Sequence, residues 1–255
     1  ASVGRYSQYM HQFVNGYSTR GSDGMWILSD TDIPIISSVN YHLGANWDYN
    51  NFFINTEAYY KTTDNLNTFY NETDPLSSSL RKILSGSGNA NGIELLIRKK
   101  TGKMKGWISY LLSKTTYEFP DINLGKSFYA DHDKTHELKL VSLTKIRGWN
   151  MTFSWVLSSG RVYTGLENLE HSKKSIYILK DMNKQRLGTI HHLDVSVSRT
   201  ITILKTRIHY GSSIYNVYNK NNISHRRYNP FTQSISLTDV FMFGITPTLF
   251  IDISY

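Results

Sequence analysis

The chain carries two short segments rich in histidine and aspartate, at residues 191–194 and 131–136. In an extended strand His192 and Asp194 would point to the same face, because side chains alternate between faces. Imidazoles and carboxylates brought together in this way could bind a divalent metal or exchange protons. The same residue types also hydrogen-bond one another on a water-facing protein wall, and this structural interpretation is favoured. We therefore predict no metal site, no cofactor and no catalytic residue among His191, His192, Asp194, Asp131, His132, Asp133 and His136.

Motifs for nucleophilic or phosphate chemistry are missing from the sequence. There is no serine-centred nucleophile elbow, no glycine-rich phosphate loop and no Glu-x-x-His metal helix. The chain has no cysteine, which excludes disulfides, thiol nucleophiles and cysteine-ligated metals. Ser158, Ser159 and His132 could be fitted to a hydrolase site, but nothing in their spacing supports it. An enzyme is therefore not predicted.

The elements that must position these side chains are strands, and the clearest of them ends the chain. Between residues 241 and 255 every second residue is apolar, and most residues between them are small or polar. One face of such a strand is a continuous apolar stripe. A tilted strand crosses a bilayer with about 9–11 residues, so this stretch is long enough. The stripe and its final aromatic resemble the insertion signal of bacterial outer-membrane barrels, here Phe241, Phe243, Leu249, Ile251, Ile253 and Tyr255.

Earlier segments repeat this alternation, and their connections differ in length on the two sides. Short turns are expected at 50–51, at 101–102, at 148 and near 203. The connections between them are much longer. Outer-membrane barrels have short turns on one side and long loops on the other, and a soluble β-sandwich, the alternative, rarely does. We predict an all-β fold, a transmembrane antiparallel up-and-down β-barrel to which this chain contributes about ten strands.

The alternation also predicts which side chains face lipid. The apolar series is expected to point outward and the polar series into the lumen. The outward set includes Trp149, Phe153, Trp155, Leu249 and Ile251, and the inward set includes Thr152 and Thr248.

The composition agrees with a membrane barrel. No run approaches the ~20 apolar residues of a transmembrane helix. The 18 tyrosines and 5 tryptophans suit the two interfaces of a membrane. The net charge of +8 is spread over turns and loops without a dense basic block, so no nucleic acid partner is predicted. The first residues already have a strand pattern, so an exported protein must have lost its signal or continue upstream.

The long connections hold the candidate contact residues. Aromatic side chains there could touch a ligand, and basic side chains could pair with lipopolysaccharide phosphates or simply be solvated. The aromatic candidates are Trp26, Tyr70, Phe128 and Tyr177. The basic candidates are Lys173, Lys174, Lys180, Lys184, Arg226 and Arg227.

Seven segments, in order, resemble the C-terminal half of TonB-dependent outer-membrane receptors of the Bacteroidetes type. Among them are Asn-Gly-Ile-Glu-Leu-Leu-Ile-Arg from residue 91, Gly-Trp-Ile-Ser-Tyr from 106 and Ile-Tyr-Asn-Val-Tyr-Asn-Lys-Asn from 214. They occur from residue 91 to the last strand, at residues 91–102, 106–113, 130–136, 158–164, 191–194, 214–221 and 241–255.

The resemblance implies a barrel of about 22 strands around an N-terminal plug. TonB would supply energy through a short N-terminal box. Residues 1–255 would form the C-terminal part of this barrel, and the plug, the box and the first half have no counterpart here. The implied partners are the remaining strands and the plug, from an upstream part or a second chain, with TonB, the barrel-assembly machinery, lipid and lipopolysaccharide. The implied location is the outer membrane of a Gram-negative bacterium.

The resemblance leaves three functions open. The leading one is energised uptake of a ligand, the second is a scaffold subunit of an outer-membrane complex, and the weakest is a barrel hydrolase. In an arc of a wide barrel, the strands near 3–9 and 241–255 would both be edges. Bare backbone groups are costly inside a bilayer, so both edges are expected to pair with strands from elsewhere.

Overall fold

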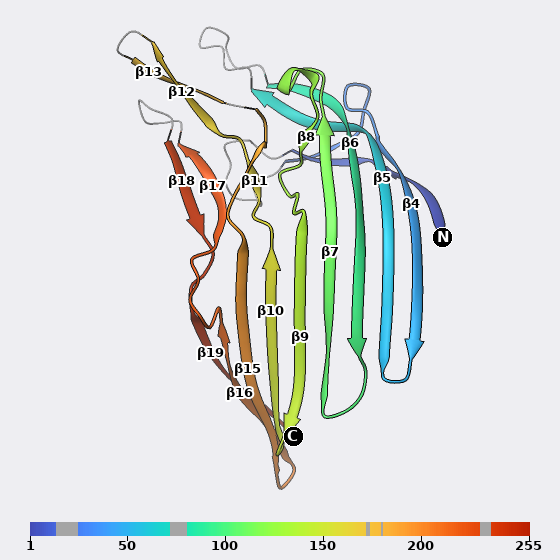
Figure 1. Ribbon diagram of the computed structural model, residues 1–255, viewed down its shortest axis with the longest axis vertical. Coiled ribbons are helices and arrows are strands. Elements are labelled where there is room, and N and C mark those ends of the chain that lie inside the picture. The colour runs from blue at the N-terminus through green and yellow to red at the C-terminus, as the bar shows by residue number, and fades with distance from the viewer. Residues whose placement is uncertain (14–24, 72–80, 172–173, 180, 230–235) are drawn as a thin grey trace.

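The computed structural model describes residues 1–13, 25–71, 81–171, 174–179, 181–229 and 236–255. Ten of its strands follow one another in a single antiparallel sheet, and an eleventh short strand, β8 (Phe128–Tyr129), pairs with β7 beside them. Each strand pairs with the next one along the path (Figure 1). These residues contain one short 3-10 turn, Asn123–Gly125, and no helix that is long and apolar enough to cross a membrane. The prediction of an all-β antiparallel fold is confirmed. The ten strands are β1 (Ser2–Gln8), β4 (Ile36–Tyr49), β5 (Phe52–Asn71), β6 (Arg81–Lys99), β7 (Met104–Glu118), β9 (His136–Ile146), β10 (Trp149–Ser158), β15 (Ile190–Ile203), β16 (Thr206–Tyr215) and β19 (Thr246–Ser254).

Tight turns join the strands at the lower end of the sheet. Asn50 has a φ of 50°, and Gly102 has a φ of 103°, so both turns use the left-handed region. Arg147 and Gly148 both have positive φ, as a two-residue type I′ hairpin requires. The four turns lie where the sequence predicted them, and the long connections all lie at the other end (Figure 1).

The connections between β1 and β4, β10 and β15, and β16 and β19 contain small two-stranded ribbons. Paired strands satisfy backbone donors and acceptors that would otherwise need water or side chains. Among the described residues there are four two-stranded ribbons. They are β2 (Met10–Phe13) with β3 (Met25–Leu28), β11 (Val162–Tyr163) with β14 (Gln185–Arg186), β12 (Leu166–His171) with β13 (Lys174–Leu179), and β17 (Ile223–Asn229) with β18 (Ser236–Phe241).

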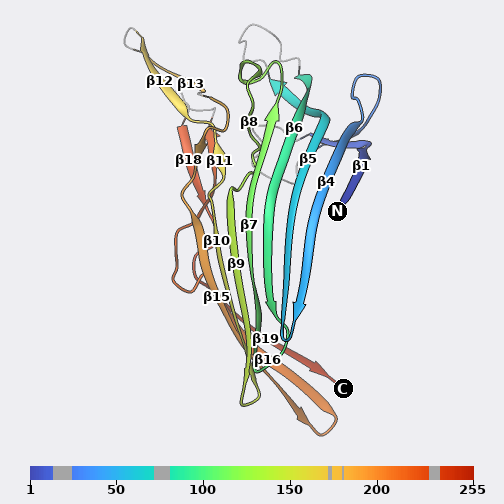
Figure 2. The same cartoon turned by 45° about the vertical axis from the view of Figure 1, so that its right-hand side comes forward.

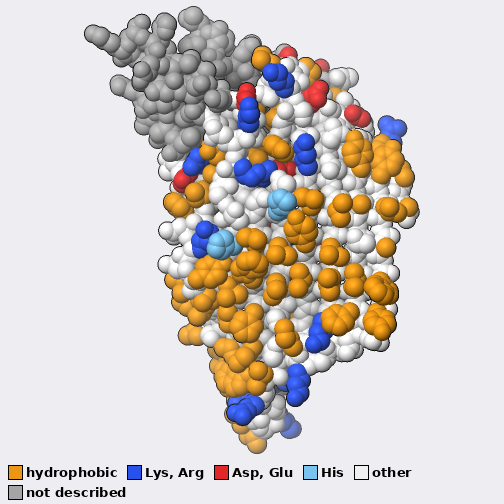
Figure 3. Space-filling view, viewed as in Figure 1, with side chains coloured by type: hydrophobic (Ala, Val, Ile, Leu, Met, Phe, Trp, Pro, Cys, Tyr) orange, Lys and Arg blue, Asp and Glu red, His pale blue; other side chains and the backbone are white. Residues whose placement is uncertain are grey.

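One face of the sheet is apolar and exposed. Trp47 is 63% exposed and Leu249 is 84% exposed, although both are large and apolar. Figure 3 shows a broad band of hydrophobic side chains across the strands, with most charged side chains above or below it. One row across the sheet consists of Trp47, Ile54, Ile97, Ile108, Leu140, Trp155 and Leu193.

The opposite face is polar. Asn40, Lys61 and Thr115 share one row, and Thr152, Ser196, Ser213 and Thr248 share another. The predicted outward and inward sets therefore do lie on opposite faces of the sheet. We call the apolar face outer and the polar face inner.

The last strand is shorter than predicted. Phe241 ends β18, and β19 begins only at Thr246, so the expected continuous strand is broken between them. In this break, side chains from another segment form hydrogen bonds with the backbone. Asn216 Nδ2 donates to the carbonyl of Phe243 at 3.2 Å, and the amide of Ile245 donates to Asn219 Oδ1 at 2.8 Å.

The hairpin of β5 and β6 is longer than predicted. The polar stretch from about residue 67 to 89, with its serines and glycines, is typical of a loop, but pairing continues to Asn71 and Arg81. Glycine makes this extension possible, because a Cβ at Gly86 would lie 2.4 Å from the carbonyl oxygen of Glu118. The small residues around Gly86 and Gly88 therefore allow neighbouring strands to pack closely, and they lie within β6 instead of a loop.

The two ends of the sheet are not paired with each other among the described residues. β1 covers only the first half of β4, from Ile36 to His42. β19 pairs with β16 alone. Figure 2 shows that the sheet is bent, with β16 and β19 inclined strongly to the direction of β4 to β7.

Arginine substitutions at two neighbouring residues test the assignment of the faces. Phe153→Arg places a charge on the outer face, where it should cost about 2–4 kcal/mol of unfolding free energy near mid-membrane. Thr152→Arg, its matched control on the inner face, should cost much less. Denaturant unfolding in lipid vesicles measures both, and equal costs would contradict the assignment.

Candidate functional site

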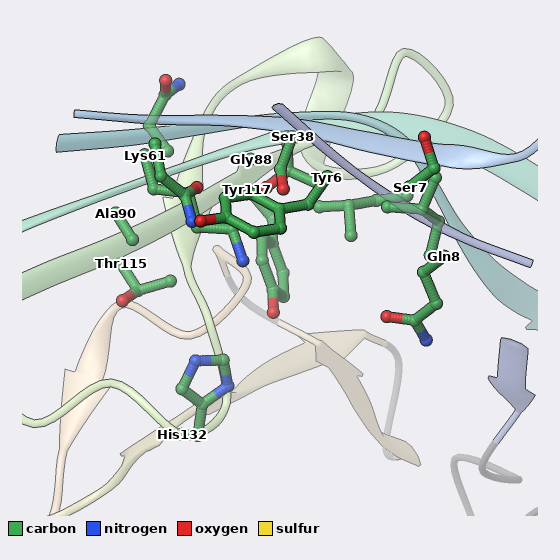
Figure 4. Close-up of a pocket in the computed structure, with 15 residues that line it drawn as sticks. Tyr6, Ser7, Gln8, Ser38, Lys61, Gly88, Ala90, Thr115, Tyr117 and His132 are labelled. Carbon is green, nitrogen blue, oxygen red and sulfur yellow. The ribbon is translucent and has the colours of Figure 1, made fainter. Parts of the chain in front are cut away.

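The inner face of β4 to β7 carries a cavity below the long connections. Its volume is about 520 Å³. Figure 4 shows Tyr6 and Tyr117 close together at its centre, with Lys61 on one side and His132 across from them. His132 comes from the connection between β7 and β9, so the cavity joins the inner wall to that connection.

Hydrogen-bonding groups without negative charge line this cavity. Ser38, Asn40 and Thr63 supply neutral polar groups, Lys61 supplies an ammonium group, and His132 supplies an imidazole. The Oδ1 atom of Asn40 is buried and has no hydrogen-bond partner among the described residues. A buried acceptor left unpaired is costly, so it favours a donor from a bound group. The arrangement suits a neutral or anionic polar group.

The connection between β7 and β9 is held in place by Asp133. Its side chain is fully buried, and Oδ1 accepts from the amide of Thr115 at 2.7 Å. The Nη2 atom of Arg186 donates to Oδ2 at 2.6 Å. Arg186 Nη1 also donates to the carbonyls of Asp133 and Gly160, at 3.1 and 2.9 Å. One arginine therefore ties together the connections on either side of the β9–β10 hairpin.

Asn183 makes a second link between the same connections. Its Nδ2 atom donates to the carbonyl of Tyr129 at 2.9 Å and to Asp131 Oδ1 at 2.6 Å. Its amide donates to Thr164 Oγ1 at 3.1 Å. Asp131 and Asp133 are thus both bound by protein donors, as the structural interpretation of this segment expected.

The 191–194 segment has the same character. Asp194 Oδ1 accepts from the buried amide of Asn216 at 2.9 Å and lies 3.0 Å from His192 Nδ1. Asn222 Nδ2 donates to the carbonyl of His191 at 2.9 Å, and Asn222 Oδ1 accepts from the amide of His191 at 3.1 Å. Within the described ranges no three histidine or acidic side chains form a possible metal site.

The four aromatic ligand candidates lie in strands at the end of the molecule that carries the long connections, and not in open loops. Trp26 is in β3 and is 57% exposed. Tyr70 is in β5 and Tyr177 is in β13, and their side chains lie outside the described part. Phe128 was a wrong choice, because it is 7% exposed and packs with Leu84, Phe119 and Ile122. Its ring anchors the connection and is not available to a ligand.

Two of the six basic candidates form hydrogen bonds with carboxylates, and the side chains of the other four lie outside the described part of the structure. Arg226 Nε donates to Asp239 Oδ1 at 2.6 Å, and its guanidinium lies 4.5 Å from the centroid of the Tyr163 ring. That hydrogen bond raises the pKa of Arg226. Lys184 is exposed and bonds to Asp181, which raises its pKa as well. Lys173 and Lys180 lie outside the described residues, as do the side chains of Lys174 and Arg227.

The sequence did not identify Arg186, Asn183, Asn216 or Asn222 as residues that hold the connections. Asn183 and Asn216 have φ near 50°, a conformation that asparagine adopts more readily than most residues. Asparagines clustered directly before and after strands were the available signal, and it identifies a turn without naming the partner.

Breaking the Asp133–Arg186 ion pair should loosen the outer connections. Arg186→Met leaves a buried carboxylate unpaired, which typically costs about 3 kcal/mol or more. Asp133→Asn combined with Arg186→Met should cost less than Arg186→Met alone. Lys184→Met, two residues away in an exposed pair, is the matched control and should cost much less than Arg186→Met, because solvent screens an exposed ion pair. Urea unfolding measures all three, and a Lys184→Met cost equal to that of Arg186→Met would contradict this role.

No protein-family model matches the sequence, and a search of curated proteins found no match either. Solved structures do match. The ferric yersiniabactin uptake receptor FyuA of Yersinia pestis superposes with a TM-score of 0.58 at 15% identity, over 98% of this chain and 33% of the receptor. The iron transporter FrpB of Neisseria meningitidis gives a TM-score of 0.56 at 16% identity, over 88% of this chain and 32% of the transporter.

The ferripyoverdine receptor of the Pseudomonas aeruginosa outer membrane gives a TM-score of 0.54 at 13% identity, over 87% of this chain and 27% of that receptor. These neighbours are TonB-dependent outer-membrane receptors. At such low identity the likeness establishes the fold, a sheet built like part of their barrels. The chain spans about a third of the length of the proteins it matches.

Proposed function

We propose that residues 1–255 form the C-terminal part of the barrel of a TonB-dependent receptor, and that the complete protein takes up a ligand across the outer membrane of a Gram-negative bacterium. The observation that carries this proposal is a sheet of ten strands in sequence order with one exposed apolar face. Such a face costs free energy in water and is stable against lipid. The likeness to solved receptor barrels supports the same conclusion.

In this proposal the ligand is captured by the outer connections and the apex of a plug. TonB then drives a rearrangement of the plug that releases the ligand inward. The inner cavity beside Asn40 and Lys61 would contact the plug or the ligand. The missing part of a barrel of about 22 strands would come from upstream or from a second chain.

The Bacteroidetes type and the insertion signal remain parts of the proposal. The type rests on the seven sequence segments. For insertion by the barrel-assembly machinery we retain Leu249, Ile251, Ile253 and Tyr255, which lie on or directly after β19. Phe241 and Phe243 precede the break in the strand and are less suitable.

The surroundings of the two serines weigh against a hydrolase. Ser159 Oγ accepts from the amide of His136 at 3.1 Å, and Ser158 is 2% exposed. His132 lines the inner cavity, and among the described residues no hydrogen bond joins it to Ser158 or Ser159. The neighbours are also receptors and transporters, not enzymes.

Depletion of compounds from the growth medium tests uptake even while the ligand is unidentified. The organism that makes this protein is grown under iron limitation first, because the matched proteins are named for iron and its chelates. Mass spectrometry of the medium then compares the wild type with strains lacking the receptor gene or tonB. We expect at least one compound to persist in both mutants and to disappear from the wild-type medium.

The scaffold function gives a different outcome. Depletion of every compound would be unchanged without the receptor gene under several nutrient limitations. The tagged protein would also copurify with an outer-membrane partner in fixed proportion. That pair of results would overturn uptake in favour of a scaffold.

A further inference from the structure

A shallow groove crosses the outer face of β10, β15, β16 and β19 near the short turns. Its volume is about 500 Å³. Trp149 and Tyr210 stand at one end and pack edge to face, with ring centroids 5.8 Å apart. Val197 and Ser212 are smaller and lie on the next row, together with Leu249. Small side chains between large ones leave the hollow.

Arg199 lies on the same row as Trp149 and Tyr210, at the end of this groove. Its guanidinium is 5.5 Å from the centroid of the Trp149 ring. Among the described residues no carboxylate pairs with it. Its outward neighbours along β15 are Val197 and Ile201, so a lone cation stands in an apolar face. A cation in this setting is costly unless an anion compensates it.

The β9–β10 turn shows the level of Arg199 along the sheet. Trp149 directly follows Gly148, and a Cβ at Gly148 would lie 3.8 Å from Arg199 Nε. Arg199 is therefore level with the point where this hairpin leaves the sheet. Tryptophan and tyrosine concentrate at the interface of a membrane, where the lipid phosphates lie.

We propose that Arg199 and this groove bind one glycerophospholipid of the periplasmic leaflet. The guanidinium would donate to the phosphate oxygens, a pairing for which its planar fork is well suited. One acyl chain would lie along the groove over Val197 and Ser212. Short turns of outer-membrane barrels face the periplasm, so the leaflet follows from the position of the turns. The inference rests on the proposed function, because it needs the outer face to be in the outer membrane.

Photolabelling by a lipid tests the site. The full-length protein is placed in nanodiscs of phosphatidylethanolamine and phosphatidylglycerol that contain a trace of phosphatidylglycerol with a diazirine in its acyl chain. Arg199→Gln should lower labelling of the peptides that contain Trp149 and Tyr210 by about fivefold. Arg199→Lys, which keeps the charge without the fork, should give an intermediate yield.

Arg207→Gln is the matched control. Arg207 is on the neighbouring strand near the same turn, but it lies on the inner face in the row of Ser254. Its substitution should leave labelling unchanged. Heat-modifiable mobility on gels verifies that each variant is folded, and Arg199→Lys retains the test if Arg199→Gln does not fold.

Each other outcome is decisive. Folded Arg199→Gln with wild-type labelling overturns this inference alone and leaves the proposed function intact. A wild-type protein that does not enter the bilayer overturns both. Equal labelling of the same peptides by a lipopolysaccharide probe in outer-membrane vesicles overturns the assignment to phospholipid.

Discussion

The constraint on which the structure depends is that a bilayer offers no water to backbone amides and carbonyls. Every strand must then be paired on both sides, and β1 and β19 are each paired on only one side by the described residues. β1 also leaves the half of β4 from Leu43 to Tyr49 uncovered. Under the proposed function the sheet is an arc whose two edges pair with further strands, and those strands decide what the whole barrel can be.

The same constraint explains the separation of roles between the two ends and the two faces. Near the tight turns, the alternation of apolar and polar residues along each strand is enough to make the outer face apolar and the inner face polar. Beyond this part of the sheet, hydrogen bonds and ion pairs of individual side chains such as Asp133, Arg186 and Asn216 hold the connections in place. The inner cavity lies where the sheet meets these connections, since its lining comes from both.

Alternation and turn chemistry predicted the fold well because both are local. Phe241 to Tyr255 shows their limit, since Asn216 and Asn219, distant in sequence, interrupt the strand. The site was predicted less well. Phe128 appears as an exposed aromatic in the sequence and becomes core only through Leu84 and Phe119. Which carboxylate Arg186 meets depends on how two long connections pack, and no local pattern encodes that.

Electron cryo-microscopy of the full-length protein in lipid nanodiscs tests the central claim most directly, because it shows the neighbour of β19. We predict that the free edge of β19 is hydrogen-bonded to a strand from outside residues 1–255, with lipid against the outer face of the sheet. Direct pairing of β1 with β19 in a closed ring of the strands seen here would contradict the account and indicate a small independent barrel.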